Sequence, residues 1–574
     1  MNLFTDYEIK ILSLLKKLKN KKIIDLPNNF KGISIEIPPG NFKADISCNA
    51  AMILAKHNRT DPINFCYILK KNLLDNFKEF KTIDVAKPGF LNISFSNNFW
   101  KVHLLEIIKY SSKFGSNKDK KRKYNIEFVS ANPTGPLHVG HCRGAVLGDV
   151  LSNLLEFNGN SVLKEYYVND CGNQIKKFVL SVYYRILEIK EKKDFPQDQN
   201  LYPGDYLIDI AKKIIQQKKI KNFENFDKIH RVLTNESLKT SMNIIKNNLS
   251  SLGIKHDNFV YESKLIKRNL VSKTVNKLKK RNFIYEGKLK PPKGESTKNW
   301  KERKLLLFNS SKFGDDIDRA LQKEDMSWTY FASDIAYHSQ KIERKFDALI
   351  NVLGSDHAGY IKRITSAVKA LSGNKTNFVC KVSQLVKLYK EGVPFKMSKR
   401  KGDYITVEDL LKEVGKDSVR FMMLNRSSDV ELDFDFQKVA EKSKDNPVFY
   451  VQYAYARINS IFKSLNLKLE TKIKLKKENF NLNEHEIEIL RKISEWPKCI
   501  EISSNRLEPH RIPFYLYDLV TLFHSYWNLG KERKEFRFVE NYQLNNSRLI
   551  LLQALAVVIK NGMKILGVST PKSM

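Results

Sequence analysis

The sequence predicts an α/β protein in three parts: a central domain built on a parallel sheet, a smaller α+β domain before it, and an all-α bundle after it. Three observations predict this arrangement. The N-terminal part mixes a helical pattern with two alternating strand patterns, the middle opens with a strand, a loop and a long helix, and strand patterns fade after Phe436. With 574 residues, the chain is also long enough for several domains.

The N-terminal α+β domain is expected over residues 1–112. Ile11, Leu15 and Leu18 recur at helical spacing near the start. Residues 32–38 and 89–95 alternate apolar and polar side chains, as strands do. A charged, polar linker follows, and we place the domain boundary within it.

The central domain is expected over residues 113–436, with a Lys-rich helical insertion at about 190–290. Residues 125–130 form a short apolar strand, which a Pro/Gly loop joins to a helical pattern over residues 138–155. A strand, a Gly-containing loop and a helix in this order open a nucleotide-binding βα unit of the Rossmann type. Another strand is predicted at residues 348–353.

Residues 437–574 are predicted to form the all-α bundle, because Phe449, Tyr453 and Ala456 share one helix face. The apolar run at residues 549–559 is too short to span a bilayer, so we expect a core helix there. The N-terminus has no unbroken apolar stretch and therefore does not resemble a signal peptide. These features predict a cytoplasmic protein without a membrane anchor.

The net charge bears on the kind of binding partner, and the cysteine spacing bears on disulfides and zinc sites. The formal net charge of +37 indicates a polyanionic partner, although a genome-wide bias toward Lys, Asn and Ile explains it about equally well. The six cysteines are widely spaced and form no C-x-x-C pair. This argues against a disulfide framework and against a structural zinc site, and it favours a reducing compartment.

The first chemical motif is the run A-N-P-T-G-P-L-H-V-G-H at residues 131–141. His138 and His141 lie on one face at the start of the predicted helix, where unpaired N–H groups attract phosphate. Gly140 leaves room for an adenine ring. The alternatives are a chance match, core packing, or a zinc site, for which no further ligands lie nearby.

The second motif is K-M-S-K-R at residues 396–400, followed by Lys401 and Gly402. Basic side chains on a Gly-flanked loop can close over a polyphosphate and offset the charge on a leaving pyrophosphate. By itself, a solvated lysine run explains this stretch as well.

The two motifs, in this order and about 260 residues apart, resemble the signature of class I aminoacyl-tRNA synthetases. Within that class the chain is similar to arginyl-tRNA synthetases over nearly its whole length, and the Lys-rich insertion matches least. The stretches that carry the similarity are residues 45–51, 126–149, 166–174, 202–205, 285–287, 291–294, 313–316, 329–338, 354–359, 449–457 and 566–569.

The resemblance implies roles for individual residues. The catalytic residues it implies are His138, His141, Lys396 and Lys399. The ATP-binding residues it implies are Pro133, Gly135, Gly140, Gly354, Asp356, His357, Met397 and Ser398. It implies that Glu127, Asn132, Tyr330 and Asp334 bind arginine, whose planar guanidinium calls for carboxylates and a phenol. The tRNA-binding residues it implies are Asn49, Tyr450, Gln452, Tyr453 and Arg457.

Structural roles compete with several of these assignments. Asp334 could be a helix cap or a surface charge, and Tyr330 could belong to the core. Residues 354–357 could form a plain loop. The aromatic residues of the bundle are more often core than RNA platforms, and Arg457 and Asn49 could serve structure alone.

The function that the resemblance implies is ATP-dependent activation of L-arginine and its transfer to tRNA(Arg). Mg²⁺ is expected to accompany ATP, and no structural zinc is expected. The sequence does not reveal the oligomeric state, and a monomer is our working expectation. Three rival functions are a class I synthetase for another amino acid, a small-molecule nucleotidylyltransferase, and a non-catalytic RNA-binding protein.

Overall fold

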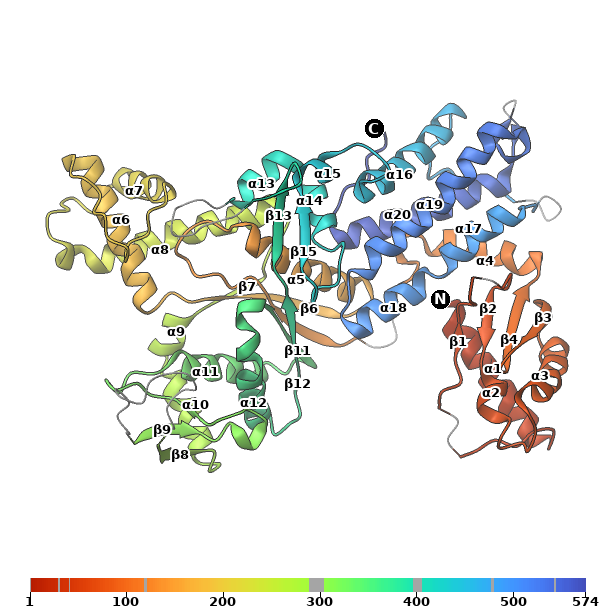
Figure 1. Ribbon diagram of the computed structural model, residues 1–574, viewed down its shortest axis with the longest axis horizontal. Helices are drawn as coiled ribbons and strands as arrows, with labels where there is room; N and C mark the ends of the chain where they lie inside the picture. The colour runs from red at the N-terminus through yellow and green to blue at the C-terminus, as the bar shows by residue number, and fades with distance from the viewer. Residues whose placement is uncertain are drawn as a thin grey trace. The chain divides into compact units, whose positions relative to one another are not determined.

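A computed structural model describes the chain from residue 2 to residue 574, except for residues 29, 30, 41, 118–120, 289–303, 396–404, 476–479, 541 and 542. The chain forms two compact units (Figure 1). One unit comprises Asp119–Glu441, and the other combines Met1–Lys118 with Lys442–Met574.

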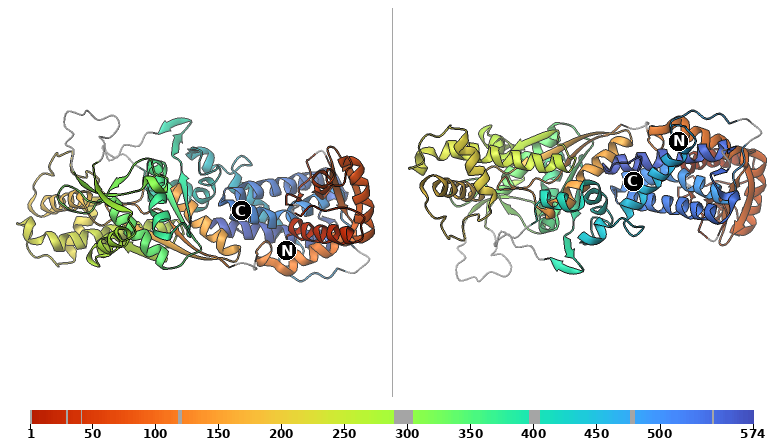
Figure 2. Two further views of the ribbon diagram at one scale, coloured as in Figure 1. Left: turned by 90° about the horizontal axis from the view of Figure 1, so that it is seen from below. Right: turned by 90° about the horizontal axis from the view of Figure 1, so that it is seen from above.

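The first unit is built on a five-stranded, all-parallel sheet in the order β12-β11-β5-β6-β7. Figure 1 labels β6, β7, β11 and β12 of this sheet, and Figure 2 shows the same unit from two further sides. Its strands are β5 (Lys123–Glu127), β6 (Ser161–Val168), β7 (Asn258–Tyr261), β11 (Ala348–Gly354) and β12 (Asn377–Ser383). The chain builds the sheet outward from β5 to β7 and then returns to the other side of β5 with β11. This reversal between β5 and β11 is the topological switch point of a Rossmann-type sheet, where α/β proteins bind their ligands. The predicted fold class is therefore confirmed.

Three long helices pack near the switch point. Helix α5 (Val139–Phe157) follows β5 and contacts β5, β6, β11 and β12, which explains why most of its residues are buried. Helices α11 (Tyr330–Glu343) and α12 (Ile361–Ser372) pack on each other and share an apolar core with α10 (Leu270–Lys279). The core of this unit thus fixes the helices that begin at the carboxyl edge of the sheet.

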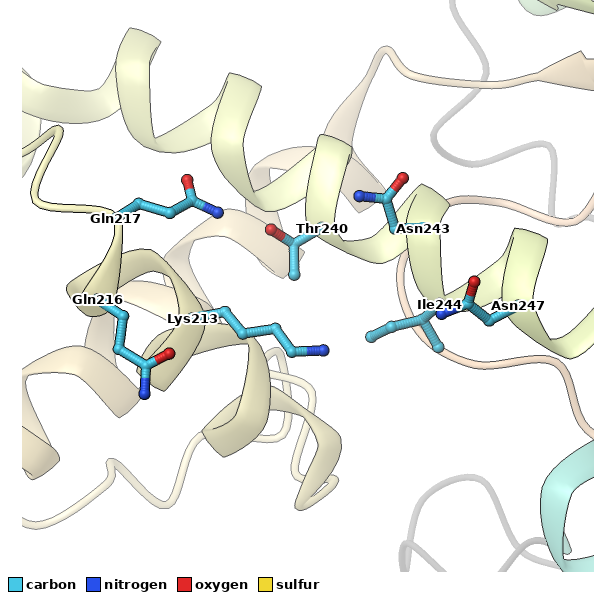
Figure 3. A pocket seen from close by; sticks show the side chains of 7 residues that line it. All are labelled: Lys213, Gln216, Gln217, Thr240, Asn243, Ile244 and Asn247. Atoms are coloured by element: carbon cyan, nitrogen blue, oxygen red, sulfur yellow. The ribbon is translucent and has the colours of Figure 1, made fainter.

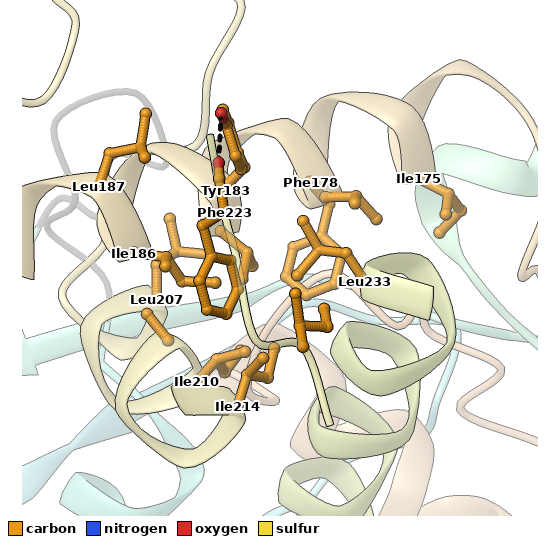
Figure 4. Packing of buried hydrophobic residues seen from close by; sticks show 14 residues of the cluster. Ile175, Phe178, Tyr183, Ile186, Leu187, Leu207, Ile210, Ile214, Phe223 and Leu233 are labelled. Carbon is orange, nitrogen blue, oxygen red and sulfur yellow. Dashed lines mark hydrogen bonds between the residues drawn. The ribbon is translucent and has the colours of Figure 1, made fainter. Parts of the chain in front are cut away.

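The segment between β6 and β7 consists of helices α6 (Asn173–Glu191), α7 (Tyr206–Gln216) and α8 (Phe226–Ser251). Its core is an apolar cluster that includes Phe178, Ile210 and Leu233 (Figure 4). The predicted insertion at about 190–290 differs from this structure, because β7 lies inside that range and belongs to the central sheet. A strand of four residues carries too little alternation to be recognised within a Lys-rich stretch.

The remainder of this unit is peripheral to the sheet. One small antiparallel sheet consists of β8 (Ile284–Gly287), β9 (Leu305–Phe308) and β10 (Arg319–Ala320). A second three-stranded sheet consists of β13 (Val386–Lys390), β14 (Val393–Phe395) and β15 (Leu432–Asp435). The remaining helices are α9 (Glu262–Lys267), α13 (Val407–Val414), α14 (Lys416–Met422) and α15 (Phe436–Ala440).

The second unit contains an antiparallel sheet in the order β1-β2-β4-β3 and a helical bundle. The sheet strands are β1 (Ile35–Glu36), β2 (Ile46–Cys48), β3 (Phe80–Ala86) and β4 (Phe90–Phe95), accompanied by α1 (Leu3–Asn20), α2 (Ala50–Leu54), α3 (Pro62–Asn76) and α4 (Asn97–Tyr110). The bundle consists of α16 (Pro447–Ser464), α17 (Glu484–Ser494), α18 (Trp496–Arg506), α19 (Arg511–Glu532) and α20 (Asn546–Leu566), with a short hairpin of β16 (Val539–Glu540) and β17 (Gln543–Leu544).

Buried polar contacts tie the α+β part of this unit to the bundle. The Arg491 guanidinium donates to the buried Asp45 carboxylate at 2.7 Å, and the buried Trp496 indole donates to the carbonyl of Phe114 at 3.0 Å. Helix α20 is, among the described residues, the one helix long and apolar enough to cross a membrane, and 83% of its most apolar window is buried. This agrees with the core helix predicted at residues 549–559.

Candidate active site

The two motif histidines lie at the N-terminus of α5. His138 is the cap residue, and its Nδ1 accepts a hydrogen bond from the Gly140 amide at 3.1 Å. The His138 amide in turn donates to Nδ1 of His141 at 3.3 Å, and the ring centroids lie 3.9 Å apart. Since both Nδ1 atoms accept, Nε2 carries the proton in each neutral imidazole and is a donor. The pair therefore places two N–H donors at a positive helix end, where anions are attracted, and Nε2 of His138 is buried there.

The motif loop, which we define as residues 128–138, leaves β5 through a strained turn. Val129 and Ser130 have positive φ angles of 69° and 42°, a conformation that side chains with a Cβ rarely adopt. Ser130 Oγ donates to Glu127 at 3.1 Å and accepts from the Tyr167 amide at 3.0 Å. The hydroxyl of Tyr166 donates to the Ala131 carbonyl at 2.8 Å. Strand β6 thus holds the first half of the loop in place.

Helices α7 and α8 hold the second half of the motif loop. The Tyr206 hydroxyl donates to the Thr134 carbonyl at 2.8 Å, and a Cβ on Gly135 would lie 2.8 Å from the same ring. The buried Asn248 side chain accepts a hydrogen bond from the Leu137 amide at 3.0 Å. Both helices lie in the segment that the sequence marked as poorly matched, so neither contact was predicted. Pro133 is buried in this loop.

The chain just after the second motif is hydrogen-bonded to the first motif. The Val139 amide donates to the Ile405 carbonyl at 3.1 Å, and the Val407 amide donates to the Leu137 carbonyl at 2.9 Å. Thr406 then caps α13 with a capping box. The predicted site residues Lys396, Met397, Ser398 and Lys399 lie outside the described residues.

Glu127 ends β5 at the carboxyl edge of the sheet and is only 8% exposed. Its carboxylate forms a 2.5 Å ion pair with Lys341, an entirely buried residue of α11. The Lys341 ammonium also donates to Asn351 on the neighbouring strand β11 at 3.1 Å. The sequence placed Glu127 in a functional pocket but gave no indication of this internal cation.

Asp334 lies two turns before Lys341 on α11. Its carboxylate accepts from the Tyr360 hydroxyl at 2.7 Å and lies 3.1 Å from Nδ1 of His338. Burial would raise the pKa of Asp334, but the charge and hydrogen bond of His338, the Tyr360 hydroxyl and the Lys341 charge together hold it below its usual range. Asp334 is therefore an anion that still exposes 22% of its side chain.

Tyr330 begins α11, one turn before Asp334, and is 52% exposed. This exposure excludes the core role that competed with its functional assignment. Its hydroxyl lies next to the position that a Cβ on Gly172 would occupy, and the φ of 89° at Gly172 is a conformation that favours glycine. Asn132 of the motif loop donates to Gln174 at 2.5 Å, on the adjoining helix α6.

Glu262 is a third carboxylate that sequence reasoning missed. It opens α9 directly after β7, is 3% exposed, and has no ion pair among the described residues. Burial raises its pKa, as do the nearby charges of Asp170 and Asp334, while hydrogen bonds from Ser333 and Tyr167 oppose the shift. The sequence analysis did not predict strand β7. Had it done so, Glu262 would have been recognised as a residue at the carboxyl edge of the sheet.

Glu127, Asp334 and Glu262 form what we call the carboxylate cluster. Tyr167 on β6 lies among them: burial first, and then the charges of Glu262, Asp334 and Glu127, raise its pKa. Three carboxylates converge on this cluster, whereas Lys341 is the one lysine paired with any of them in the described parts of the chain. The cluster can therefore accept a further cation, and a planar cation with several N–H donors suits three separate carboxylates.

Gly354 ends β11, next to β5 in the sheet, and Asp356 and His357 follow in a short 3₁₀ turn, Ser355–Tyr360. Both side chains are exposed, and His357 Nε2 lies 3.6 Å from the Asp356 carboxylate. These residues share the carboxyl edge of the sheet with the motif loop, but no buried contact singles them out.

The predicted RNA contacts lie in the other unit, where several make internal bonds. Arg457 donates to the Tyr453 hydroxyl at 2.8 Å, contacts Nδ1 of His524 at 2.9 Å, and lies over the Tyr453 and Trp527 rings. Burial, together with the nearby Arg457 charge, lowers the pKa of His524 to about 4. His524 is therefore neutral at pH 7, and its Nδ1 can accept a hydrogen bond from the Arg457 guanidinium. These internal contacts support the structural role that competed with RNA binding at Arg457, and RNA binding there stays a prediction.

Three further predicted RNA contacts, Tyr450, Gln452 and Asn49, also make contacts within their own unit. Tyr450 packs on His524, with ring centroids 4.2 Å apart, and Gln452 donates to the Ser569 carbonyl at 3.1 Å. Asn49 accepts from the Ser34 amide at 2.8 Å and donates to the Gly32 carbonyl at 2.9 Å. Asn49 thus links two loops of the α+β part, which is the structural role that competed with RNA binding.

Comparison with known families matches the entire architecture. Residues 6–95 match the arginyl tRNA synthetase N terminal domain, residues 103–463 match the class I (R) tRNA synthetase catalytic domain, and residues 451–574 match the DALR anticodon binding domain. The chain is 56% identical to the arginine–tRNA ligase of Pelagibacter ubique (strain HTCC1062) over 577 aligned residues, with 100% of both chains covered. It is 42% identical to the arginine–tRNA ligase of Allorhizobium ampelinum, again with 100% of both covered.

Solved structures agree in fold. The arginyl-tRNA synthetase of Thermus thermophilus superposes with a TM-score of 0.71 at 18% identity, and 100% of each chain is covered. Since a catalytic-domain match spans more than half of the chain and the curated relatives align over its full length, the chain belongs to the arginyl-tRNA synthetase family of class I aminoacyl-tRNA synthetases.

Proposed function

We propose that this chain activates L-arginine with ATP to arginyl-adenylate, releases pyrophosphate, and transfers the arginyl group to the 3′ end of tRNA(Arg). The observation that carries this proposal is the carboxylate cluster at the same edge of the sheet as the two histidines of α5. One group recognises the cationic side chain of arginine, and the other binds the phosphates of ATP.

In the first step, the arginine carboxylate attacks the α-phosphate of ATP in line, a new C(O)–O–P bond forms, and the bond to pyrophosphate breaks. A carboxylate is already ionised at neutral pH, so the step needs no general base. Catalysis then consists of positioning and charge stabilisation. His138 and His141 donate hydrogen bonds from Nε2 to the phosphates. Lys396 and Lys399 stabilise the negative charge that develops on the leaving pyrophosphate.

The covalent chain supports the joint action of the two motifs. Ile405 is bonded to Val139, next to the histidines, and Lys399 is six residues before Ile405. Because Lys399 is so close to Ile405 along the sequence, we propose that the two motifs act on one ATP molecule.

The carboxylate cluster binds the arginine side chain. Asp334 and Glu262 accept hydrogen bonds from the guanidinium, and Tyr330 covers the pocket from the start of α11. Glu127 contributes less free charge than the sequence suggested, because Lys341 already neutralises it. Asn132 holds the amino-acid end of the substrate. Gly135, Gly140, Gly354, Asp356 and His357 surround the nucleotide.

Mg²⁺ enters with ATP and neutralises phosphate charge. Mg²⁺ in nucleotide sites is held mainly by substrate phosphates and waters, so we propose that the nucleotide carries this ion into the site. In the second step, a terminal ribose hydroxyl of the RNA attacks the adenylate carbonyl, and AMP leaves. We further propose a cytoplasmic monomer whose +37 charge serves RNA binding.

Charging of total tRNA with each of the twenty amino acids in turn tests the proposed function. Arginine alone should yield aminoacyl-tRNA, in an ATP-dependent reaction. Equal charging with another amino acid would contradict the assignment of the carboxylate cluster. Absence of any charging together with intact RNA binding would favour the non-catalytic alternative.

A further inference from the structure

A cavity of about 280 Å³ lies between α7 and α8, away from the carboxylate cluster (Figure 3). Six of its seven lining residues have polar side chains. We call it the amide groove, and its lining residues are Lys213, Gln216, Gln217, Thr240, Asn243, Ile244 and Asn247.

The amide groove offers both kinds of hydrogen-bonding group. Each of its four carboxamides carries two donors and one acceptor oxygen, and Lys213 supplies one positive charge. Figure 3 shows the Lys213 side chain running toward Ile244 and Asn247 on α8. Between described residues, neither Lys213 nor any of the four carboxamides makes a side-chain hydrogen bond, so these groups are available to a ligand.

Both walls of the groove are connected to the motif loop. On α7, Lys213 lies seven residues after Tyr206, which places both on one helix face about 10 Å apart. Tyr206 is the residue that bonds the Thr134 carbonyl. On α8, Asn247 directly precedes Asn248, whose side chain accepts from the Leu137 amide. The two helices that line the groove are therefore the same helices that hold the second half of the motif loop.

We propose that the amide groove holds one nucleotide of the single-stranded 3′ end of tRNA while that end reaches the active site. The inference rests on the proposed aminoacylation, because that reaction requires the RNA terminus to come to the motif loop. Lys213 pairs with a phosphodiester, and Asn243 and Asn247 bind the edge of a base.

The chemistry of the lining favours a strand over a free nucleotide. One lysine matches the single negative charge of a phosphodiester, whereas a nucleoside triphosphate calls for several cations or a metal ion. Carboxamides pair with the adjacent donors and acceptors on a base edge. No aromatic residue lines the groove, so the base is held by its edge and not by stacking.

The test measures binding of tRNA(Arg) to the full chain as a function of salt. Lys213→Met should lower the slope of log affinity against log salt by about one, the value for one lost phosphate contact. Lys212→Met is the matched control, because Lys212 is exposed on the same helix but does not line the groove. Asn243→Ala combined with Asn247→Ala should weaken binding about tenfold, and the exposed Asn235→Ala on α8 should leave it unchanged.

A tRNA(Arg) that lacks its single-stranded 3′ end completes the test. If the groove holds that end, Lys213→Met and the double asparagine variant should bind the shortened RNA as the unmodified chain does. Equal effects of Lys212→Met and Lys213→Met would overturn the proposal, as would an undiminished effect of Lys213→Met on the shortened RNA. Since binding is measured without arginine or ATP, failure here is distinct from failure of the proposed amino-acid specificity.

Discussion

Replacement of Asn248 by leucine tests whether helix α8 positions the motif loop. Asn248 is 7% exposed, and its side chain accepts from the amide of Leu137, which is 1% exposed, at 3.0 Å. Leucine preserves the size of the side chain but removes the acceptor, so the buried Leu137 N–H loses its partner at a cost of about 1–3 kcal/mol. If the loop shifts to recover a bond, His138 moves with it, and a displacement of about 1 Å can cost roughly 10²-fold in rate.

We therefore expect Asn248→Leu to lower kcat/KM for ATP by about 10- to 100-fold. The assay is ATP–pyrophosphate exchange with arginine and tRNA(Arg) both present at saturation. Asn248→Asp keeps an acceptor oxygen and should restore most of the loss, whereas Asn235→Leu on the exposed side of α8 should have no effect. A value of kcat/KM for Asn248→Leu within about twofold of the unmodified chain would refute the positioning role of α8.

Four further predictions follow from the site. His141→Ala should lower turnover in the exchange assay by about 10²-fold or more while tRNA affinity in filter binding is unchanged, and unaltered turnover would remove His141 from the site. Asp334→Asn should raise KM for arginine and leave KM for ATP near its original value, whereas the reverse pattern would mean that Asp334 does not contact arginine. Because burial raises the pKa of Glu262 and its anionic form binds the guanidinium, KM for arginine should rise as the pH falls through that pKa, and Glu262→Gln should flatten this profile. The affinity for tRNA(Arg) should fall steeply with salt, and a flat response would mean that the +37 charge is only compositional.

The sequence was sufficient to predict the fold class and the place of the histidines, because both depend on local patterns. A strand, a Pro/Gly loop and a helix are adjacent in the chain, and the structure realises them as β5, the motif loop and α5. Glu127 and Gly354 were named from the family resemblance, and the structure places them at the ends of the neighbouring parallel strands β5 and β11.

What the sequence could not predict depends on contacts between distant segments. Lys341 lies 214 residues from Glu127, and nothing in the local pattern of either residue indicates the ion pair. Asn248 lies 111 residues from Leu137, inside a helix that carries no recognisable motif. Glu262 was missed for a different reason, because the strand before it has only four residues.

The most direct measurement is a crystal structure of the chain with arginine and a non-hydrolysable ATP analogue. Nε2 of both histidines and the Lys399 ammonium should lie within about 3 Å of phosphate oxygens, and the arginine guanidinium within about 3 Å of Asp334 and Glu262. A nucleotide bound away from the N-terminus of α5, or a guanidinium that contacts none of the three carboxylates, would contradict the account.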